Sequence, residues 1–317
     1  MPRLIPVALT ALLVASSAPA CRKVASSPDG ARPNESTGGV GSGGSVEGGV
    51  ASRGPRSERV EMRTPDGWTL VGDLTVGALT RPAVILVHQL SSNRNEWAPL
   101  IERLHRGPAP FTTLAIDARG HGESTRGPDG STRWQQFGND SARWDGIRRD
   151  FAAAVAYVSG QHLDANGFVF VGSSIGSTAA VRAAADERSV RALVMLSPGL
   201  DYRGLDTVDP LVRYAANSRP VFLVAGDGDT ASLLAVNTLA RRAHTLDVNA
   251  AADAGPSGDP EAVHEQVVRG TGAHGVSMAA AGVHPELWDE IAAWLDHVTM
   301  ASAATVGTPR DPAVPGP

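Results

Sequence analysis

The chain has 317 residues, a formal net charge of -5 and a hydrophobic fraction of 42%. This apolar content excludes a wholly disordered chain, and the length allows one large domain or two of ordinary size. The mild acidity and the lack of a basic block in the sequence give no electrostatic footprint for nucleic acid, so we expect no nucleic-acid partner.

The N-terminal segment has the pattern of an export signal. Arg3 supplies a positive start, residues 4–14 are apolar, and small residues follow up to Ala20. The apolar stretch is shorter than a stable membrane span requires. Cys21, the only cysteine, lies where the signal of a bacterial lipoprotein places the cysteine that receives lipid, so the segment resembles such a signal. An ordinary cleaved signal with an incidental cysteine is the alternative.

Residues 1–21 are therefore predicted to be a lipoprotein-type signal with Cys21 as the lipidation site. We expect the protein to be exported to the bacterial cell envelope and anchored to a membrane through that lipid. Residues 22–57 are dominated by Gly, Ser and Pro and are predicted to form a disordered tether, because they bury too little apolar surface to offset their ordering entropy. Residues 300–317 are predicted to be a disordered tail, which leaves residues 58–299 as the folded domain.

Short apolar runs alternate with helical patterns in that domain. An opening hairpin is predicted over residues 60–63 and 68–76, with Asp66-Gly67 as its turn. Further strands are predicted at residues 83–87, 112–116, 168–171, 192–196 and 221–224, with a weaker one at 266–269. Helices are predicted at residues 96–105, 144–158, 175–185, 231–243 and 286–298. Unbroken apolar strands between helices indicate an α/β fold with a doubly wound, mostly parallel sheet.

A candidate nucleophile follows the predicted strand at residues 168–171. Residues 172–176 read Gly-x-Ser-x-Gly, centred on Ser174, and an Ala-rich helical stretch comes next. A reversal from strand to helix within so few residues strains the serine backbone and leaves no room for side chains at the two glycines. The Ser174 hydroxyl would then lie at a helix N-terminus, where backbone N–H groups favour negative charge. A plain Gly-Ser turn is the alternative interpretation.

A serine hydroxyl needs a base near neutral pH, and His274 is our candidate among nine histidines. It lies in a glycine-flanked loop before the last predicted helix, and an ordinary histidine pKa of about 6.5 suits proton transfer. The orienting carboxylate should follow another strand, and Asp227 and Asp229 both follow the strand at residues 221–224. Asp229 is favoured because it lies further along the loop, whereas Asp227 is expected to brace the turn.

The loop after the strand at residues 83–87 is expected to help bind an oxyanion. A loop in this position commonly supplies one backbone N–H, and the residue after the nucleophile supplies another. This assigns the oxyanion hole to the amides of Gln89 and Ile175, with the amide of Leu90 as a further candidate. His88 is expected to brace the loop.

These segments, in this order, resemble the α/β-hydrolase superfamily over about residues 58–299. Residues 117–124 also look like that superfamily's Asp-x-Arg-Gly-His-Gly-x-Ser loop, whose role there is structural. Many relatives carry a helical cap in the segment that corresponds to residues 200–219, and this segment is short here. The resemblance therefore implies a small or absent cap and an open site, similar to that of compact esterases and dienelactone-hydrolase-like members. Residues 245–264, rich in Ala, Gly and Asp, look like a loose insertion.

The resemblance implies a serine hydrolase with the triad Ser174, Asp229 and His274. A carboxylesterase that acts on a small-molecule ester through an acyl-enzyme is the leading prediction. No metal and no organic cofactor is implied. Thioesterase, peptidase, amidase and haloperoxidase activities use the same fold and remain alternatives. From a different class, a non-catalytic envelope binding module that kept the fold is a further alternative.

Overall fold

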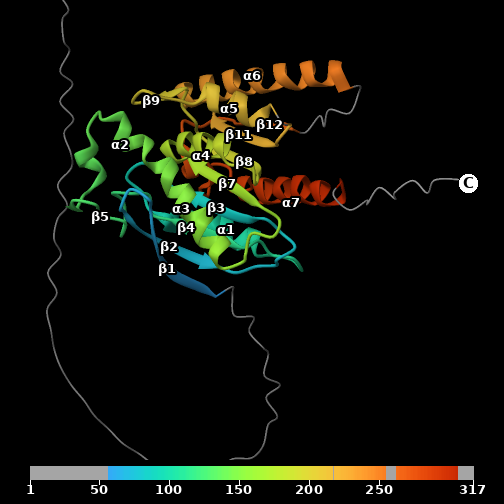
Figure 1. Ribbon diagram of the computed structural model, residues 1–317. Helices are drawn as coiled ribbons and strands as arrows, with labels where there is room; N and C mark the ends of the chain where they lie inside the picture. Colours follow the sequence, from blue (N-terminus) through green and yellow to red (C-terminus); the bar gives the residue numbers. More distant parts are fainter. Residues whose placement is uncertain (1–55, 217, 255–261, 306–317) are drawn as a thin grey trace, which may run out of the picture. The chain divides into compact units, whose positions relative to one another are not determined.

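The structure, a computed structural model, describes residues 56–216, 218–254 and 262–305 (Figure 1). The predicted signal with Cys21 and most of the predicted tether lie outside these residues, so export and lipid anchoring stay predictions from the sequence. Within the described ranges, no helix combines the length and the apolar character needed to cross a membrane.

A mostly parallel sheet forms the centre of the domain (Figure 1). Its longer strands are β1 (Ser57–Arg63), β2 (Thr69–Thr75), β3 (Ala83–Val87), β4 (Thr113–Ile116), β7 (Phe168–Ser173), β8 (Val190–Leu196), β11 (Val221–Gly226) and β12 (Val263–Val268). Two short strands, β5 (Arg126–Gly127) and β6 (Gly130–Ser131), complete the order β12-β11-β8-β7-β3-β4-β2-β5-β6, and β1 pairs with β2. The strands from β4 across to β12 pair in parallel, whereas β2 is antiparallel to both β1 and β4. The predicted doubly wound, mostly parallel sheet is confirmed.

Helices cover both faces of this sheet (Figure 1). They are α1 (Ala98–Leu104), α2 (Ser141–Asp145), α3 (Ile147–Gly160), α4 (Ile175–Asp186), α5 (Val208–Ala215), α6 (Thr230–Ala254) and α7 (Leu287–Thr305). Short 3₁₀ turns are η1 (Arg94–Trp97), η2 (Trp134–Phe137) and η3 (Gly275–Ala279). Side chains of α3 to α6 pack on one face of the sheet, and those of α1 and α7 pack on the other.

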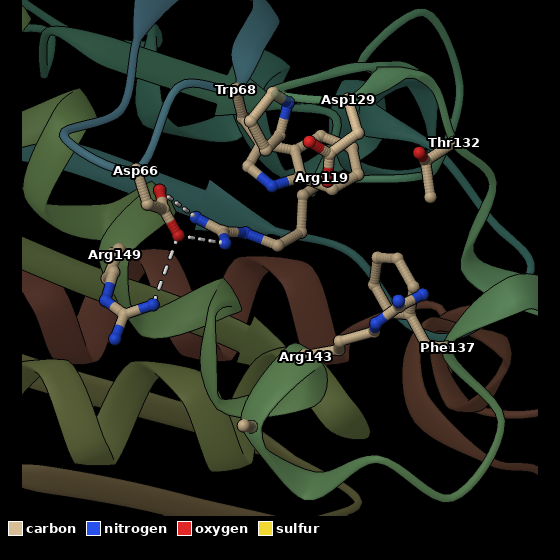
Figure 2. A pocket seen from close by; sticks show the side chains of 10 residues that line it. Asp66, Trp68, Arg119, Asp129, Thr132, Phe137, Arg143 and Arg149 are labelled. Atoms are coloured by element: carbon tan, nitrogen blue, oxygen red, sulfur yellow. Dashed lines mark hydrogen bonds and ion pairs between the residues drawn. The ribbon is translucent and has the colours of Figure 1, made fainter.

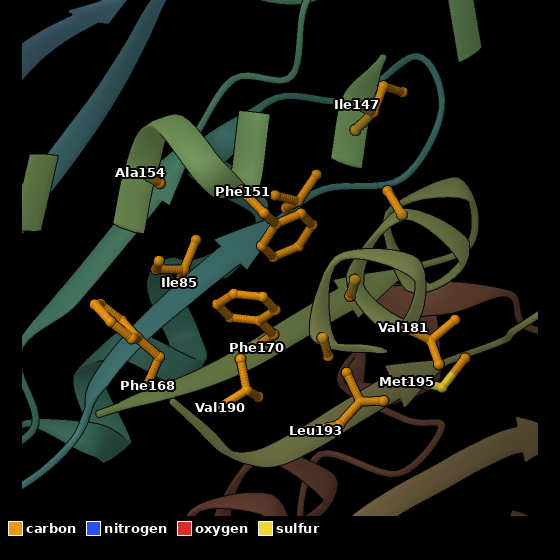
Figure 3. Packing of buried hydrophobic residues seen from close by; sticks show 14 of the residues in the cluster. Ile85, Ile147, Phe151, Ala154, Phe168, Phe170, Val181, Val190, Leu193 and Met195 are labelled. Carbon is orange, nitrogen blue, oxygen red and sulfur yellow. The ribbon is translucent and has the colours of Figure 1, made fainter. Parts of the chain in front are cut away.

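The alternation of side chains along each buried strand produces two hydrophobic layers. In β3, Ile85 belongs to the layer that contains α3 and α4, while its neighbours Val84 and Leu86 belong to the layer that contains α1 and α7. Figure 3 shows the first layer, where the Phe151 ring of α3 packs on the Phe170 ring of β7 with centroids 4.7 Å apart. Because both faces are buried, the central strands β3, β4, β7, β8 and β11 are mostly apolar, as their sequences predicted.

The segment between β8 and β11 is short. It holds a two-stranded hairpin, β9 (Asp201–Tyr202) and β10 (Leu205–Asp206), followed by α5, which packs against α4 and α6. In its described residues this segment therefore forms no separate cap domain over the sheet.

The sequence-based boundaries are wrong at two helices. Helix α6 continues to Ala254, so the loose insertion predicted from residue 245 is helical over its first part, and α7 continues to Thr305, into the predicted tail. Both extensions are rich in alanine, and the high helix propensity of alanine continues a helix that packing has already begun. At the other end of the domain, β1 begins at Ser57, and the weak last strand begins at Val263 rather than at residue 266.

Candidate active site

The turn between β7 and α4 holds Ser174 in a strained backbone conformation, with φ 54° and ψ -115°. The two glycines of the motif are required sterically. A Cβ at Gly172 would lie 2.3 Å from the backbone oxygen of Gly176, and a Cβ at Gly176 would lie 2.2 Å from the backbone oxygen of Val87. The tight turn into α4 therefore requires Gly172, and the close approach of α4 to β3 requires Gly176. Backbone strain such as that of Ser174 is typical of functional sites.

A histidine–carboxylate pair lies at the carboxyl ends of β11 and β12. The Nδ1 atom of His274 lies 2.6 Å from Oδ2 of Asp229. An ionised carboxylate only accepts hydrogen bonds, so Nδ1 carries the proton and the lone pair of Nε2 is free to accept one. Burial acts to raise the pKa of Asp229, but hydrogen bonds from His274 and Ser232 outweigh it and lower that pKa, which keeps the carboxylate charged.

Asp227, the other acidic residue of this loop, has a different role. Its carboxylate accepts hydrogen bonds from the backbone N–H groups of Gly270 and Thr271, at 2.9 and 3.0 Å. These bonds tie the loop after β11 to the loop that carries His274. Asp227 therefore braces the turn, as the sequence predicted, and the structure pairs His274 with Asp229.

Ser174, Asp229 and His274 line one pocket of about 230 Å³, together with Ser197 and Tyr202. In the described part of the chain, no hydrogen bond joins the Ser174 hydroxyl to His274. Hydrogen bonds between a nucleophile and its base are often long in the absence of substrate and shorten when it binds. A strained serine, a histidine with a free Nε2 and a carboxylate partner are the groups that acyl transfer requires.

The prediction that the Gln89 amide faces the oxyanion is wrong. That N–H donates a hydrogen bond to Oε1 of Glu96 at 3.0 Å, because η1 brings the Glu96 carboxylate back onto the loop that follows β3. Among the described residues, the backbone N–H groups of Leu90 and Ile175 have no hydrogen-bond partner. These two amides therefore remain as the candidate oxyanion donors.

His88 holds the same loop in place, as predicted. Its Nδ1–H donates to the backbone oxygen of Gln89 at 2.7 Å, and its Nε2 accepts from the backbone N–H of Ala118 at 3.0 Å. Burial lowers the pKa of His88 to about 4. The ring is therefore neutral near pH 7 and joins the loops that follow β3 and β4.

A larger pocket of about 300 Å³ lies among the β1–β2 turn, the β5–β6 hairpin and the η2–α2 segment (Figure 2). Its central guanidinium, that of Arg119, pairs with Asp66 at 2.7 Å and with the fully buried Asp150 at 2.7 Å. Arg149 contacts Asp66 from the other side. These charges neutralise one another, so the pairs hold the loop of residues 117–124 in place, in keeping with the structural role predicted for it.

Sequence reasoning missed two residues near the candidate site. Ser197 follows β8 directly, and its hydroxyl accepts the backbone N–H of Gly275 at 2.8 Å, next to His274. Its place at the carboxyl end of a parallel strand was an available signal, because functional groups gather at that edge. Glu96 had no comparable signal, because its contact with Gln89 depends on the path of the chain through η1.

Comparisons with known proteins agree with this fold. A family model described as alpha/beta hydrolase fold matches residues 82–222, while a comparison with curated proteins found no match. An esterase from Pyrococcus furiosus is similar in structure, with a TM-score of 0.58 and 19% identity, covering 77% of this chain and 92% of that chain. A dienelactone hydrolase from Anabaena variabilis has a TM-score of 0.55 and 15% identity, covering 77% of this chain and 99% of that chain.

A thermostable carboxyl esterase from Bacillus coagulans is also similar, with a TM-score of 0.53 and 12% identity, covering 77% of this chain and 99% of that chain. Likeness at these identities establishes the fold and leaves the substrate open. The sheet order, the turn from strand through serine to helix, and these matches lead to one conclusion. The chain is an α/β-hydrolase-fold protein.

Proposed function

We propose that the protein is a serine hydrolase that cleaves small carboxylic esters through an acyl-enzyme. The observation that carries this proposal is the 2.6 Å hydrogen bond between His274 and Asp229 at the pocket that Ser174 lines. A serine in a strained conformation costs free energy, and such strain is retained where it serves a function. The esterases among the similar structures support an ester as the substrate.

The reaction would begin when the Ser174 hydroxyl attacks the ester carbonyl carbon while Nε2 of His274 takes its proton. Asp229 would stabilise the resulting imidazolium, and the amides of Leu90 and Ile175 would donate hydrogen bonds to the oxyanion. His274 would then protonate the leaving alcohol. Water, deprotonated by the same histidine, would hydrolyse the acyl-enzyme and restore the Ser174 hydroxyl.

The size of the pocket favours a small acyl group. Its volume of about 230 Å³ lies below the range of roughly 300–1,000 Å³ that is typical of pockets for drug-sized ligands. Thioesters, amides and peptides would use the same three side chains and the same two amides. The volume therefore favours a short acyl group and does not distinguish the type of bond that is cleaved.

A fluorophosphonate probe, which labels activated serines, tests the proposal on the full-length chain. We expect labelling of the wild type and none of the Ser174→Ala or His274→Ala variants. His284→Ala is a matched control, because His284 also contacts a carboxylate, that of Glu290 at 2.9 Å, but does not line the pocket. This control should label like the wild type.

Turnover of 4-nitrophenyl esters completes the test. Ser174→Ala should lower the turnover rate by roughly four to six orders of magnitude, as in other triad enzymes. Activity should fall as the acyl chain outgrows the pocket. A folded wild type that takes no label and turns over no ester would contradict the proposal and favour a non-catalytic binding module.

A further inference from the structure

Gln89, in the loop that follows β3, makes hydrogen bonds through its backbone N–H, its backbone oxygen and its side-chain oxygen. Its N–H donates to Glu96, and its backbone oxygen accepts from His88 at 2.7 Å and from the N–H of Ser92 at 3.2 Å. Its side-chain oxygen accepts from the hydroxyl of Ser173 at 3.2 Å. Gln89 is therefore a structural junction, and its position is set by its neighbours.

Glu96 is an unusual partner for a backbone amide. Burial raises the pKa of its carboxyl group to about 7, against the opposing effect of hydrogen bonds from Ser92 and Gln89. Among the described residues, no cation pairs with Glu96. The nearby Arg94 is instead engaged with Asp73, Asp117 and Glu123. Burying a carboxyl group without a cationic partner costs free energy, and the hydrogen bond from the Gln89 N–H offsets part of that cost.

The geometry of the peptide bond connects this contact to the oxyanion site. The backbone oxygen of Gln89 and the N–H of Leu90 belong to one planar peptide unit, and no described peptide bond is cis. The direction of that oxygen therefore sets the opposite direction of the Leu90 N–H. Glu96 holds the preceding peptide unit through the Gln89 N–H, so both units that determine the orientation of the Leu90 amide are held by side chains.

The same residue contacts the loops of the nucleophile and of the base. Ser173, which bonds the Gln89 side chain, precedes Ser174 in the chain. A Cβ at Gly275, the residue after His274, would lie 2.0 Å from Oε1 of Gln89 and 2.4 Å from the Ser173 hydroxyl. A shift of Gln89 would therefore disturb the two neighbouring loops as well as the Leu90 amide.

We propose that Glu96 is a positioning residue for the oxyanion hole, which holds the Gln89 N–H and thereby orients the N–H of Leu90 toward the oxyanion. This inference rests on the proposed acyl transfer and names a residue outside the triad on which it depends. An oxyanion donor acts mainly in the transition state, so its misplacement lowers kcat more than it changes KM.

The test compares the wild type with Glu96→Ala, Glu96→Gln and Glu96→Asp in the full-length chain, with 4-nitrophenyl acetate as substrate. Loss of one oxyanion donor costs about 100- to 1,000-fold, and displacement should cost less, so we expect kcat of Glu96→Ala to fall about 10- to 100-fold with KM within about threefold. Glu96→Gln keeps an acceptor oxygen at the same reach and should recover most of kcat. Glu102→Ala is the control, because Glu102 is 65% exposed on α1 and its ion partners within the described ranges are Arg103 and Arg106.

Affinity for a trifluoromethyl ketone, which forms a tetrahedral adduct with an activated serine, provides a second measure. It should fall in parallel with kcat in Glu96→Ala and stay unchanged in Glu102→Ala. This parallel fall separates a role in the oxyanion hole from a general loss of folded protein, which thermal unfolding of each variant monitors.

The outcomes are distinguishable. If the wild type is active, a folded Glu96→Ala variant with the same kcat overturns this inference and leaves the proposed function standing. An equal effect of Glu96→Ala on kcat and KM, or a Glu96→Gln variant that does not recover kcat, has the same consequence. If Glu96→Ala does not fold, Glu96→Asp decides, because its shorter side chain should lower kcat in a folded protein, and an unchanged kcat overturns the inference. A wild type that takes no fluorophosphonate label overturns the proposed function and this inference with it.

Discussion

The charge of Asp229 should control the rate of acyl transfer. Replacing Asp229 by asparagine keeps the shape of the side chain and removes its negative charge. In the structure, Oδ2 of Asp229 lies 2.6 Å from Nδ1 of His274, and the Asp229 side chain is only 14% exposed. The variant should therefore fold normally while it loses the group that stabilises a protonated His274.

The magnitude follows from the charge that develops during the reaction. Two opposite unit charges about 4 Å apart attract each other by about 4 kcal/mol at an effective dielectric constant of about 20. Because about 1.4 kcal/mol corresponds to a tenfold change in rate, the full interaction is worth about a thousandfold. The His274 side chain is 46% exposed, so solvent screens part of this attraction. We expect kcat to fall about 100- to 1,000-fold.

The assay is hydrolysis of 4-nitrophenyl acetate, with Asp227→Asn as the matched control. Asp227 accepts two backbone hydrogen bonds and does not contact His274, so its variant should lose some thermal stability and keep kcat within about threefold. A folded Asp229→Asn variant with kcat within tenfold of the wild type would show that the Asp229 charge does not stabilise the protonated His274. A larger loss in Asp227→Asn would instead move the orienting role to Asp227, the alternative that the sequence left open.

Two further predictions concern stability. A Cβ at Gly176 would lie 2.2 Å from the backbone oxygen of Val87, so Gly176→Ala should lower the free energy of unfolding by about 2–3 kcal/mol or more. Gly160→Ala is the control, because a Cβ at Gly160 would have no neighbouring atom within 4 Å, and this variant should keep the midpoint of thermal unfolding. Equal midpoints for the two variants would contradict the steric argument. Burial lowers the pKa of both His88 and His121 from 6.5 to about 4. Between these pH values the unfolded chain therefore binds protons that the folded chain does not. The free energy of unfolding should be highest above pH 6.5 and should decrease as the pH falls toward 4. Urea unfolding between pH 6.5 and 4 should show that the free energy of unfolding decreases less steeply with falling pH in His121→Gln than in the wild type. An equal decrease in both proteins would rule out His121 as a cause.

Much of the candidate site could be predicted because its determinants are local. The strand before Ser174, the two glycines around it and the helix after it lie within about twenty consecutive residues, and a Cβ at Gly172 would meet the backbone of Gly176, four residues later. The parallel sheet was predictable for a similar reason, because a strand buried on both faces is a nearly continuous apolar run. His274 was identified from its glycine-flanked loop and its place before the last helix.

The ends of the helices and the choice among backbone amides depend on packing and on the path of the backbone, which no local sequence pattern specifies. The extension of α6 to Ala254 reflects alanine propensity added to a helix that packing on β11 has already begun. Gln89 was a reasonable oxyanion donor from its position after β3, but its N–H is taken by Glu96, seven residues later. No periodicity or motif specifies that contact.

The fold class, the turn that presents Ser174 and the chain order of Ser174, Asp229 and His274 follow from the amino-acid sequence, because strand periodicity and the Gly-x-Ser-x-Gly spacing are local patterns. The pairing of His274 with Asp229, which the sequence favoured over Asp227 without excluding the latter, is seen only in the folded chain. The same holds for the backbone amides, where Gln89 is engaged and Leu90 has no partner among the described residues. The first choice depends on hydrogen bonds between loops that are distant in the chain, and the second depends on the path of the backbone through η1. A hydrogen bond depends on distance and angle within tenths of an ångström, and these are set when the strands pair and bring the loops together.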